Sequence, residues 1–145
     1  MRFPSLLRAC TFALLASLSS PAFATVDDAH SFAMEAAIPF VEQGFIVRED
    51  YWNGEVASGQ GLMIKHQMFK GNEYAFWLGS ANEGVEFDLK VYDEKGKEIT
   101  IAAKSDKMFA SARVNPPRTG TYTIVFSLTS KKEKSLYWAL AYGYR

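Results

Sequence analysis

The chain has 145 residues, and its 16 lysines and arginines are balanced by 16 aspartates and glutamates, which gives a formal net charge of zero at pH 7. This balance supplies no long-range attraction to nucleic acid or to an anionic membrane surface, so we predict no nucleic-acid partner. The length is that of a single domain, which can bury roughly two-thirds of its unfolded surface.

Residues 1–24 have the pattern of a secretory signal peptide. Arg2 and Arg8 give a basic start, the stretch CTFALLASLSS is apolar, and Ala22-Phe23-Ala24 places small residues at the −3 and −1 positions. We therefore expect cleavage after Ala24 and a periplasmic or secreted protein. No later segment is apolar for the roughly 20 residues that a membrane-spanning helix needs.

The single cysteine, Cys10, lies inside this predicted signal. It raises the alternative of a lipoprotein signal. That alternative is disfavoured because Arg8 stands where apolar residues are needed and the apolar run follows the cysteine. Loss of the signal leaves no cysteine, so the mature domain has no disulfide even in an oxidising compartment.

Residues 25–44 are predicted to form an N-terminal helical segment. Apolar residues recur at spacings of three and four between Phe32 and Val41, and Asp27 or Asp28 is the expected N-cap. Pro39 should end or kink the helix just before it, and glycine at position 44 suits the C-terminal cap. The sequence favours a helix packed on the domain, with a free amphipathic arm for a partner as the alternative.

Residues 45–145 change to the two-residue period of β-strands. Every second residue from Val85 to Val91 is apolar, and the segment 74–78 is apolar enough to be buried on both faces. Glycine, proline and asparagine separate such runs, which is typical of hairpins. The pattern predicts a mainly β fold, an antiparallel β-sandwich or jelly roll with one N-terminal α-helix.

Three segments occur in an order that resembles the bacterial pre-peptidase C-terminal domain. They are YWNGEVASGQ, then MFKGNEYAFWL followed by FDLKVYDEKGKEI, and NPPRTGTYTIVFSL, within about residues 51–142. The resemblance implies a secreted β-sandwich of a kind often appended to proteases or standing alone in exported proteins. The family's hairpin commonly reads Asp-Leu-Asp-Leu. In this chain Asp88 matches the first acid but Lys90 replaces the second, which argues against a cation site of the family's type.

The acidic residues of this hairpin are the first candidates for a metal site. Asp88 is predicted on the outer face of a strand and Asp93 at the tip, roughly 17 Å apart if the strand is extended, so one calcium ion cannot bind both. Asp88 with Asp106 from the KSDK loop is a candidate pair. We favour the alternative that Asp93 accepts hydrogen bonds within its own turn while Glu86, Asp88 and Lys90 form a solvated face. We therefore predict no metal or other cofactor.

Catalytic motifs do not stand out in the sequence. His30 and His66 are the only histidines, one in the predicted helix and one in a predicted strand. The chain contains neither a Gly-x-Ser-x-Gly elbow nor a His-Glu-x-x-His helix. His66 shares its strand face with apolar residues, which is typical of a packed histidine. A hydrolase is therefore disfavoured, and we predict that the protein is not an enzyme.

The stretch Asp50-Tyr51-Trp52-Asn53 is the candidate ligand-binding site, because flat rings beside polar groups can stack on sugars. For Trp52 itself a packing role is favoured, and the other two tryptophans lie in strand patterns where burial is the default. Two functions follow. The favoured one is a non-catalytic exported module that binds an unknown protein or cell-envelope component, and the alternative is a carbohydrate- or calcium-dependent binding module that uses Trp52 and the loop acids.

Overall fold

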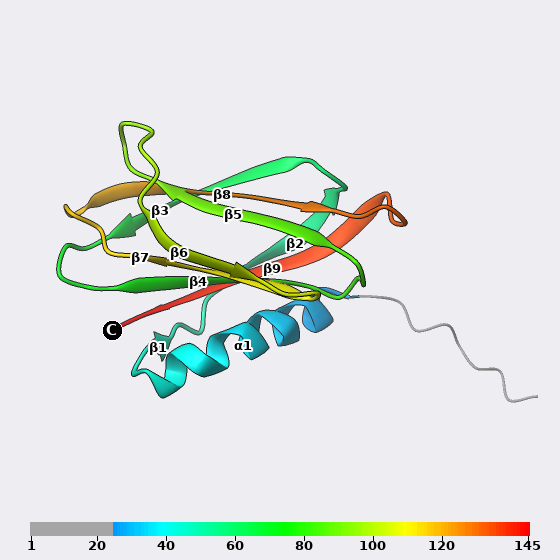
Figure 1. Cartoon of the computed structure of the whole chain (residues 1–145), viewed down its shortest axis with the longest axis horizontal. Coiled ribbons are helices and arrows are strands. Elements are labelled where there is room, and N and C mark those ends of the chain that lie inside the picture. Colours follow the sequence, from blue (N-terminus) through cyan, green and yellow to red (C-terminus); the bar gives the residue numbers. More distant parts are fainter. Residues whose placement is uncertain (1–24) are drawn as a thin grey trace, which may run out of the picture.

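The computed structural model describes residues 25–145, so the predicted signal peptide lies outside the described residues. Its elements are α1 (Val26–Glu42), β1 (Ile46–Val47), β2 (Trp52–Ala57), β3 (Gly61–Met68), β4 (Tyr74–Ser80), β5 (Glu86–Tyr92), β6 (Thr100–Ser105), β7 (Phe109–Val114), β8 (Gly120–Thr129) and β9 (Ser135–Tyr144). Two antiparallel sheets face each other, and α1 covers the outer side of one of them (Figure 1). The predicted mainly β fold with one N-terminal helix is confirmed.

The last strand of the chain, β9, lies inside the larger sheet. This sheet, sheet A, runs β1-β9-β4-β7-β6, and β2 pairs with β9 beside β1. The smaller sheet, sheet B, runs β3-β8-β5. Within residues 25–145, no helix combines the length and the hydrophobicity that crossing a membrane requires.

Helix α1 begins at a capping box, and its N-cap differs from the predicted residues. Thr25 is the N-cap, and its hydroxyl oxygen accepts a hydrogen bond from the Asp28 backbone N–H at 3.2 Å. The Asp28 carboxylate accepts in return from the Thr25 backbone N–H. The expectation of Asp27 or Asp28 as N-cap was wrong because Thr25 supplies the capping oxygen and Asp28 serves as its partner three residues later.

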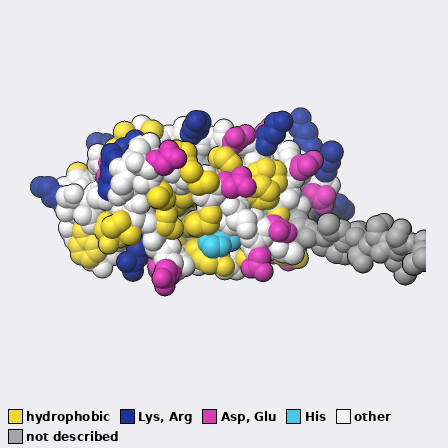
Figure 2. Space-filling view, turned by 90° about the horizontal axis from the view of Figure 1, so that it is seen from below, with side chains coloured by type: hydrophobic (Ala, Val, Ile, Leu, Met, Phe, Trp, Pro, Cys, Tyr) yellow, Lys and Arg dark blue, Asp and Glu magenta, His cyan; other side chains and the backbone are white. Residues whose placement is uncertain are grey.

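The helix also continues past Pro39 to Glu42, so the alternative that Pro39 ends it was wrong. Pro39 is exposed, so the carbonyl that its missing N–H leaves without a partner lies on the solvent side of the helix. Val41, which was expected on the packed face, is 49% exposed. Figure 2 views the molecule from the helix side, where hydrophobic side chains are seen at the surface among acidic ones.

The C-terminal glycine was predicted correctly. Gly44 has a φ of +94°, a conformation that suits glycine, and its N–H donates to the Val41 carbonyl at 3.0 Å. The Phe45 N–H donates to the Phe40 carbonyl at 3.0 Å, and the two phenyl rings pack edge to face at 5.5 Å. This is a Schellman motif with its usual hydrophobic contact.

Helix α1 packs on sheet A through its smallest side chains. Its buried residues are alanines: Ala29, Ala33, Ala36 and Ala37. A Cβ atom added to Gly79 on β4 would overlap the Ala29 carbonyl oxygen and lie 2.5 Å from the Ala33 nitrogen, so the helix and the sheet touch backbone to backbone. The helix is therefore part of the domain, and the alternative of a free arm does not hold.

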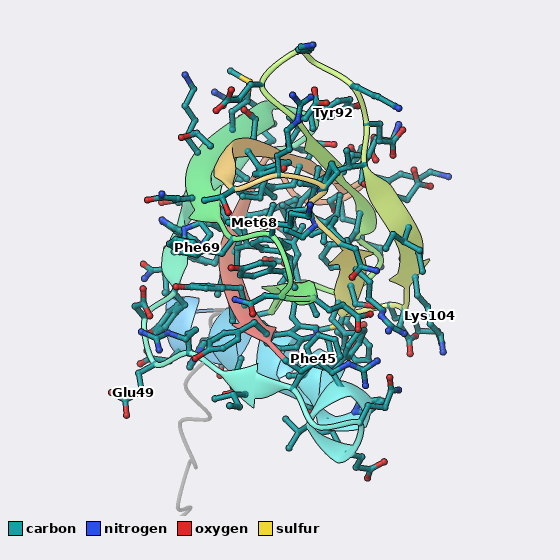
Figure 3. All side chains as sticks on the ribbon, turned by 90° about the vertical axis from the view of Figure 1, so that its left-hand side faces the viewer. Phe45, Glu49, Met68, Phe69, Tyr92 and Lys104 are labelled. Carbon is teal, nitrogen blue, oxygen red and sulfur yellow. The ribbon has the colours of Figure 1, made fainter. Side chains whose placement is uncertain are left out.

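The sandwich core follows the predicted alternation. Leu89 and Val91 on β5 are buried, whereas Asp88 and Lys90 between them are exposed. Strand β4 is buried along its whole length because sheet B covers one face and α1 the other. Figure 3 shows the layers end on, with Met68 pointing into the space between the sheets.

The chain segment that follows β5 does not form the second strand of a simple hairpin. After the turn, β5 forms a single bridge, between Tyr92 and Glu98, and the chain then crosses to sheet A as β6. Strand β6 pairs with β7, with a bulge between Thr100 and Ala102. This crossover makes β6 the outermost strand of sheet A on that side.

An ion cluster joins the end of the chain to the end of the helix. Glu73 accepts hydrogen bonds from the guanidinium groups of Arg113 and Arg145, the latter at 2.8 Å. Arg145 also donates to the Gln43 carbonyl at 2.6 Å and lies over the Phe45 ring. Partial burial alone would raise the pKa of Glu73, but the hydrogen bonds from Arg113 and Arg145 outweigh it and hold this pKa below its ordinary value.

We expect the Glu73 cluster to make stability depend on pH in the acid range. Because its pKa is lower in the folded state than in the unfolded state, its contribution is fully present above about pH 4.5 and is lost as the pH falls through the folded-state pKa. Replacing Glu73 with Gln should cost about 1.5–3 kcal/mol at pH 7, the usual worth of hydrogen bonds to a charged group. It should also make the free energy of unfolding, measured in urea, fall less steeply as the pH is lowered through the acid range. Glu83→Gln, at an exposed position, is the control, and a parallel acid limb for Glu73→Gln and wild type would contradict the assignment.

Candidate functional site

An aromatic cleft opens beside β3 and β9, on the side of the sandwich where β1 and β2 lie. It encloses about 360 Å³. Its lining mixes rings with polar groups: Arg48, His66, Gln67, Phe69, Asn72, Tyr74, Tyr142 and Tyr144. We call these residues, together with Asp50 and Trp52 at the border, the aromatic cleft. Strand pairing brings them together from well-separated parts of the chain.

His66 on β3 is the centre of the ring cluster. Its imidazole centroid lies 4.5 Å from the Tyr142 ring and 5.4 Å from the Trp52 ring, with edge-to-face geometry in both pairs. Burial lowers the pKa of His66 below its ordinary value, and the Asp50 carboxylate opposes this only in part. At neutral pH the imidazole is therefore uncharged and offers one donor and one acceptor nitrogen.

A polar network holds the Tyr142 ring in place. The Tyr142 hydroxyl donates to Asp50 Oδ2 at 3.3 Å, and Arg48 Nε lies 3.8 Å from Asp50 Oδ1. A hydrogen bond between the Arg48 and Tyr142 side chains raises the pKa of Arg48, and burial raises the pKa of the Tyr142 hydroxyl. The cleft thus presents ring faces and neutral hydrogen-bonding groups beside the solvent-exposed ion pair of Arg48 and Asp50.

The structure divides the predicted stretch Asp50-Tyr51-Trp52-Asn53 between the two faces of sheet A. Trp52 packs against the core on the cleft side, and Asp50 joins Tyr142 there. Tyr51 points toward the helix, where its ring stacks on His30 with centroids 3.8 Å apart, and Asn53 is exposed. Two of the four residues therefore belong to the aromatic cleft. The packing contacts expected for Trp52 are present.

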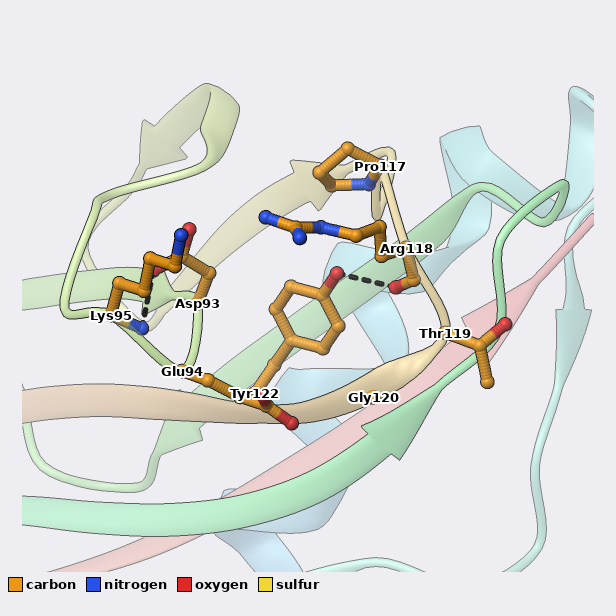
Figure 4. A pocket seen from close by; sticks show the side chains of 8 residues that line it. All are labelled: Asp93, Glu94, Lys95, Pro117, Arg118, Thr119, Gly120 and Tyr122. Atoms are coloured by element: carbon orange, nitrogen blue, oxygen red, sulfur yellow. Dashed lines mark hydrogen bonds between the residues drawn. The ribbon is translucent and has the colours of Figure 1, made fainter.

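The acidic side chains in the turn after β5 accept hydrogen bonds from backbone N–H groups, as predicted for Asp93. Asp93 Oδ1 accepts from the backbone N–H groups of Lys95 and Lys97, both at 2.9 Å. Glu94 Oε1 accepts from the Thr121 N–H at 3.1 Å, which ties the turn to the start of β8. Figure 4 shows the small pocket between them, where the Tyr122 hydroxyl donates to the Arg118 carbonyl. These contacts give the segment 117–122, part of NPPRTGTYTIVFSL, a structural role.

The candidate metal pair does not form a recognisable ligand set. Asp88 Oδ1 lies 4.0 Å from the Lys90 ammonium group on the outer face of β5. Asp106 Oδ1 accepts from the Lys107 N–H in the loop after β6. Across residues 25–145, no three acidic or histidine side chains gather as a metal site would require.

The sequence matches no protein-family model and no curated protein. The resemblance to the pre-peptidase C-terminal domain therefore stays a prediction, and the functional assignment depends on the geometry of the aromatic cleft.

Proposed function

We propose that this protein is an exported, non-catalytic binding module that recognises a component of the cell envelope through the aromatic cleft. The observation that carries the proposal is the convergence of His66 and Tyr142 with Gln67 and Asn72 around one open cavity. The Trp52 ring packs against both His66 and Tyr142 at its border. Clefts that combine apolar rings with a few placed polar groups are the usual form of ligand sites. The signal-like N-terminus supports export.

The chemistry of the cleft favours binding over catalysis. Its lining contains no serine, threonine or cysteine side chain that could act as a nucleophile. The one carboxylate at its border, Asp50, is engaged with Arg48 and Tyr142. These contacts of the Asp50 carboxylate disfavour a role as the general base for a substrate.

A carbohydrate ligand is the second candidate, and one observation favours it. Tyr142 and Tyr144 line the same cavity as Gln67 and Asn72, whose side-chain amide donates to the Tyr74 hydroxyl at 3.3 Å. Ring faces suit the apolar face of a sugar, and amides can both donate to and accept from its hydroxyl groups. No comparable observation favours calcium dependence, since Asp88 is paired with Lys90.

We expect His66→Ala to weaken binding of the immobilised protein to a solubilised cell-envelope fraction by roughly tenfold or more, as the loss of a central interface residue does. The substitution removes the ring that supports both Trp52 and Tyr142. The matched control is His30→Ala, the other histidine of the chain, which lies on the helix side and should bind as wild type does.

Equal retention of envelope material by wild type, His66→Ala and His30→Ala would contradict the proposal. Titration with neutral and N-acetylated oligosaccharides then separates the two candidates. A change in tryptophan emission on saturation would report on Trp52, because Trp77 and Trp138 are buried. If the protein binds envelope material but its tryptophan emission responds to no sugar, only the carbohydrate candidate is excluded.

A further inference from the structure

The hydroxyl group of Tyr74 is a hydrogen-bond donor without an acceptor in the aromatic cleft. Tyr74 is the most buried residue that lines the cavity, at 4% exposed. Its oxygen accepts two hydrogen bonds, from the Phe69 backbone N–H at 2.9 Å and from Asn72 Nδ2 at 3.3 Å. Within residues 25–145 this hydroxyl group donates to no acceptor. Both lone pairs of the oxygen are used, so the group can only donate to a ligand.

The surroundings of this donor favour a neutral acceptor. Arg48 is the one charged side chain in the lining of the cavity, and it already lies 3.8 Å from the Asp50 carboxylate. His66 is uncharged at neutral pH because burial lowers its pKa. A ligand carboxylate at Tyr74 would therefore be buried without a cation of its own, which is costly.

A carbonyl oxygen is the neutral acceptor that matches Tyr74. It only accepts, whereas a sugar hydroxyl also carries a hydrogen, and the Tyr74 oxygen has no lone pair left for that hydrogen. Aromatic rings stand beside the donor: the Tyr144 ring centroid lies 6.2 Å from that of Tyr74, and Tyr142 lines the same cavity. A carbonyl group that bears a methyl group would place this apolar end against the rings.

We propose that the ligand of the aromatic cleft is an N-acetylated sugar, whose acetamido carbonyl oxygen accepts the free hydrogen of the Tyr74 hydroxyl. This inference rests on the proposed function, because it concerns the ligand of the same cleft. The acetamido group ends in a methyl group, so it can reach a buried donor while the sugar ring stays near Phe69, which is 51% exposed. A peptide backbone carbonyl fits less well, since the chain on both sides would have to follow it into a cavity of about 360 Å³.

Two β-1,4-linked trisaccharides test this inference, because they differ in the group that Tyr74 would bind. The N-acetylglucosamine trimer carries acetamido groups where the glucose trimer carries hydroxyl groups. We expect wild-type protein to bind the N-acetylated trimer roughly tenfold more tightly or better in isothermal titration calorimetry, the usual effect of pairing a buried donor. Equal dissociation constants for the two trimers would overturn the inference. So would an N-acetylated tripeptide that binds as tightly as the N-acetylated trimer, since it would indicate a peptide ligand.

We expect Tyr74→Phe to abolish the preference for the N-acetylated trimer, because it removes the donor and keeps the ring. The matched control is Tyr122→Phe. The Tyr122 ring is as buried as that of Tyr74, but its hydroxyl group donates to the Arg118 carbonyl and does not line the cleft. This control should keep the wild-type preference. A folded Tyr74→Phe protein that also keeps the preference would contradict the inference.

Saturation-transfer NMR of the wild-type protein gives a reading without any substitution. The acetyl methyl protons of the N-acetylated trimer should receive more saturation than its sugar-ring protons, because the methyl group lies deepest in the cleft. Saturation confined to the sugar-ring protons would overturn the inference.

Failure of this inference can be told apart from failure of the proposed function. Retention of envelope material that is lost in His66→Ala, without binding of either trimer to wild-type protein, would contradict the N-acetylated ligand and leave the envelope-binding cleft in place. Equal retention by wild type and His66→Ala would contradict the proposed function itself.

Discussion

Replacing Gly79 with Ala is expected to lower the free energy of unfolding by about 3 kcal/mol, the upper part of the range for overpacked interiors. The added methyl group would occupy the space of the Ala29 carbonyl oxygen and the Ala33 nitrogen. These are backbone atoms, so no side-chain rotation can make room. The whole of α1 would have to move away from β4 and would separate the alanines of the helix from Ala75 and Trp77.

Chemical denaturation of Gly79→Ala beside Gly61→Ala isolates this effect. Gly61 begins β3, and a Cβ atom there would meet nothing within 4 Å. The same change should be neutral or slightly stabilising at that position, because alanine restricts the unfolded chain more than glycine does. Equal unfolding midpoints for the two variants would show that the close contact between helix and sheet is not present in solution.

Replacing Leu89 with Asp is expected to unfold the domain. Leu89 is 5% exposed and belongs to the core between the sheets. Loss of a buried leucine costs about 2–5 kcal/mol, and an unpaired carboxylate in its place adds a desolvation cost. The sum approaches the whole stability of a small domain, about 5–15 kcal/mol.

The neighbouring change Asp88→Asn provides the control for Leu89→Asp. Asp88 is exposed on the opposite face of β5 and makes a long contact with Lys90, so its loss should be within about 0.5 kcal/mol of neutral. Far-UV circular dichroism and a thermal melt of both variants suffice. A folded Leu89→Asp protein with the wild-type midpoint would mean that β5 presents its other face to the core.

Local features of this fold could be predicted from the sequence because their causes are local. The alternation in β5 follows from the two-residue period, and the C-terminal cap of α1 follows from glycine at position 44, although the continuation of the helix past Pro39 was missed. The N-cap was missed since Thr25, Asp27 and Asp28 are all good capping residues, and only the reciprocal bonds between Thr25 and Asp28 decide among them.

The aromatic cleft was only half predictable, because strand pairing assembles it. Asp50 and Trp52 stood out in the sequence, but Tyr142 reaches them through the pairing of β9 with β2. His66 arrives from the other sheet, and nothing in its own segment indicates which strand of sheet A it will face. One signal was available: His66 shares its strand face with apolar residues, which indicates that its ring packs against other side chains.

The place of β9 affects when this protein can begin to fold. Its ten residues are made after those of β1, β2 and β4, yet all three strands pair with them. A chain without β9 has no central strand in sheet A, so sheet A cannot assemble until β9 is present. For the exported protein proposed above, assembly that waits for β9 would favour transport of the chain before it has folded.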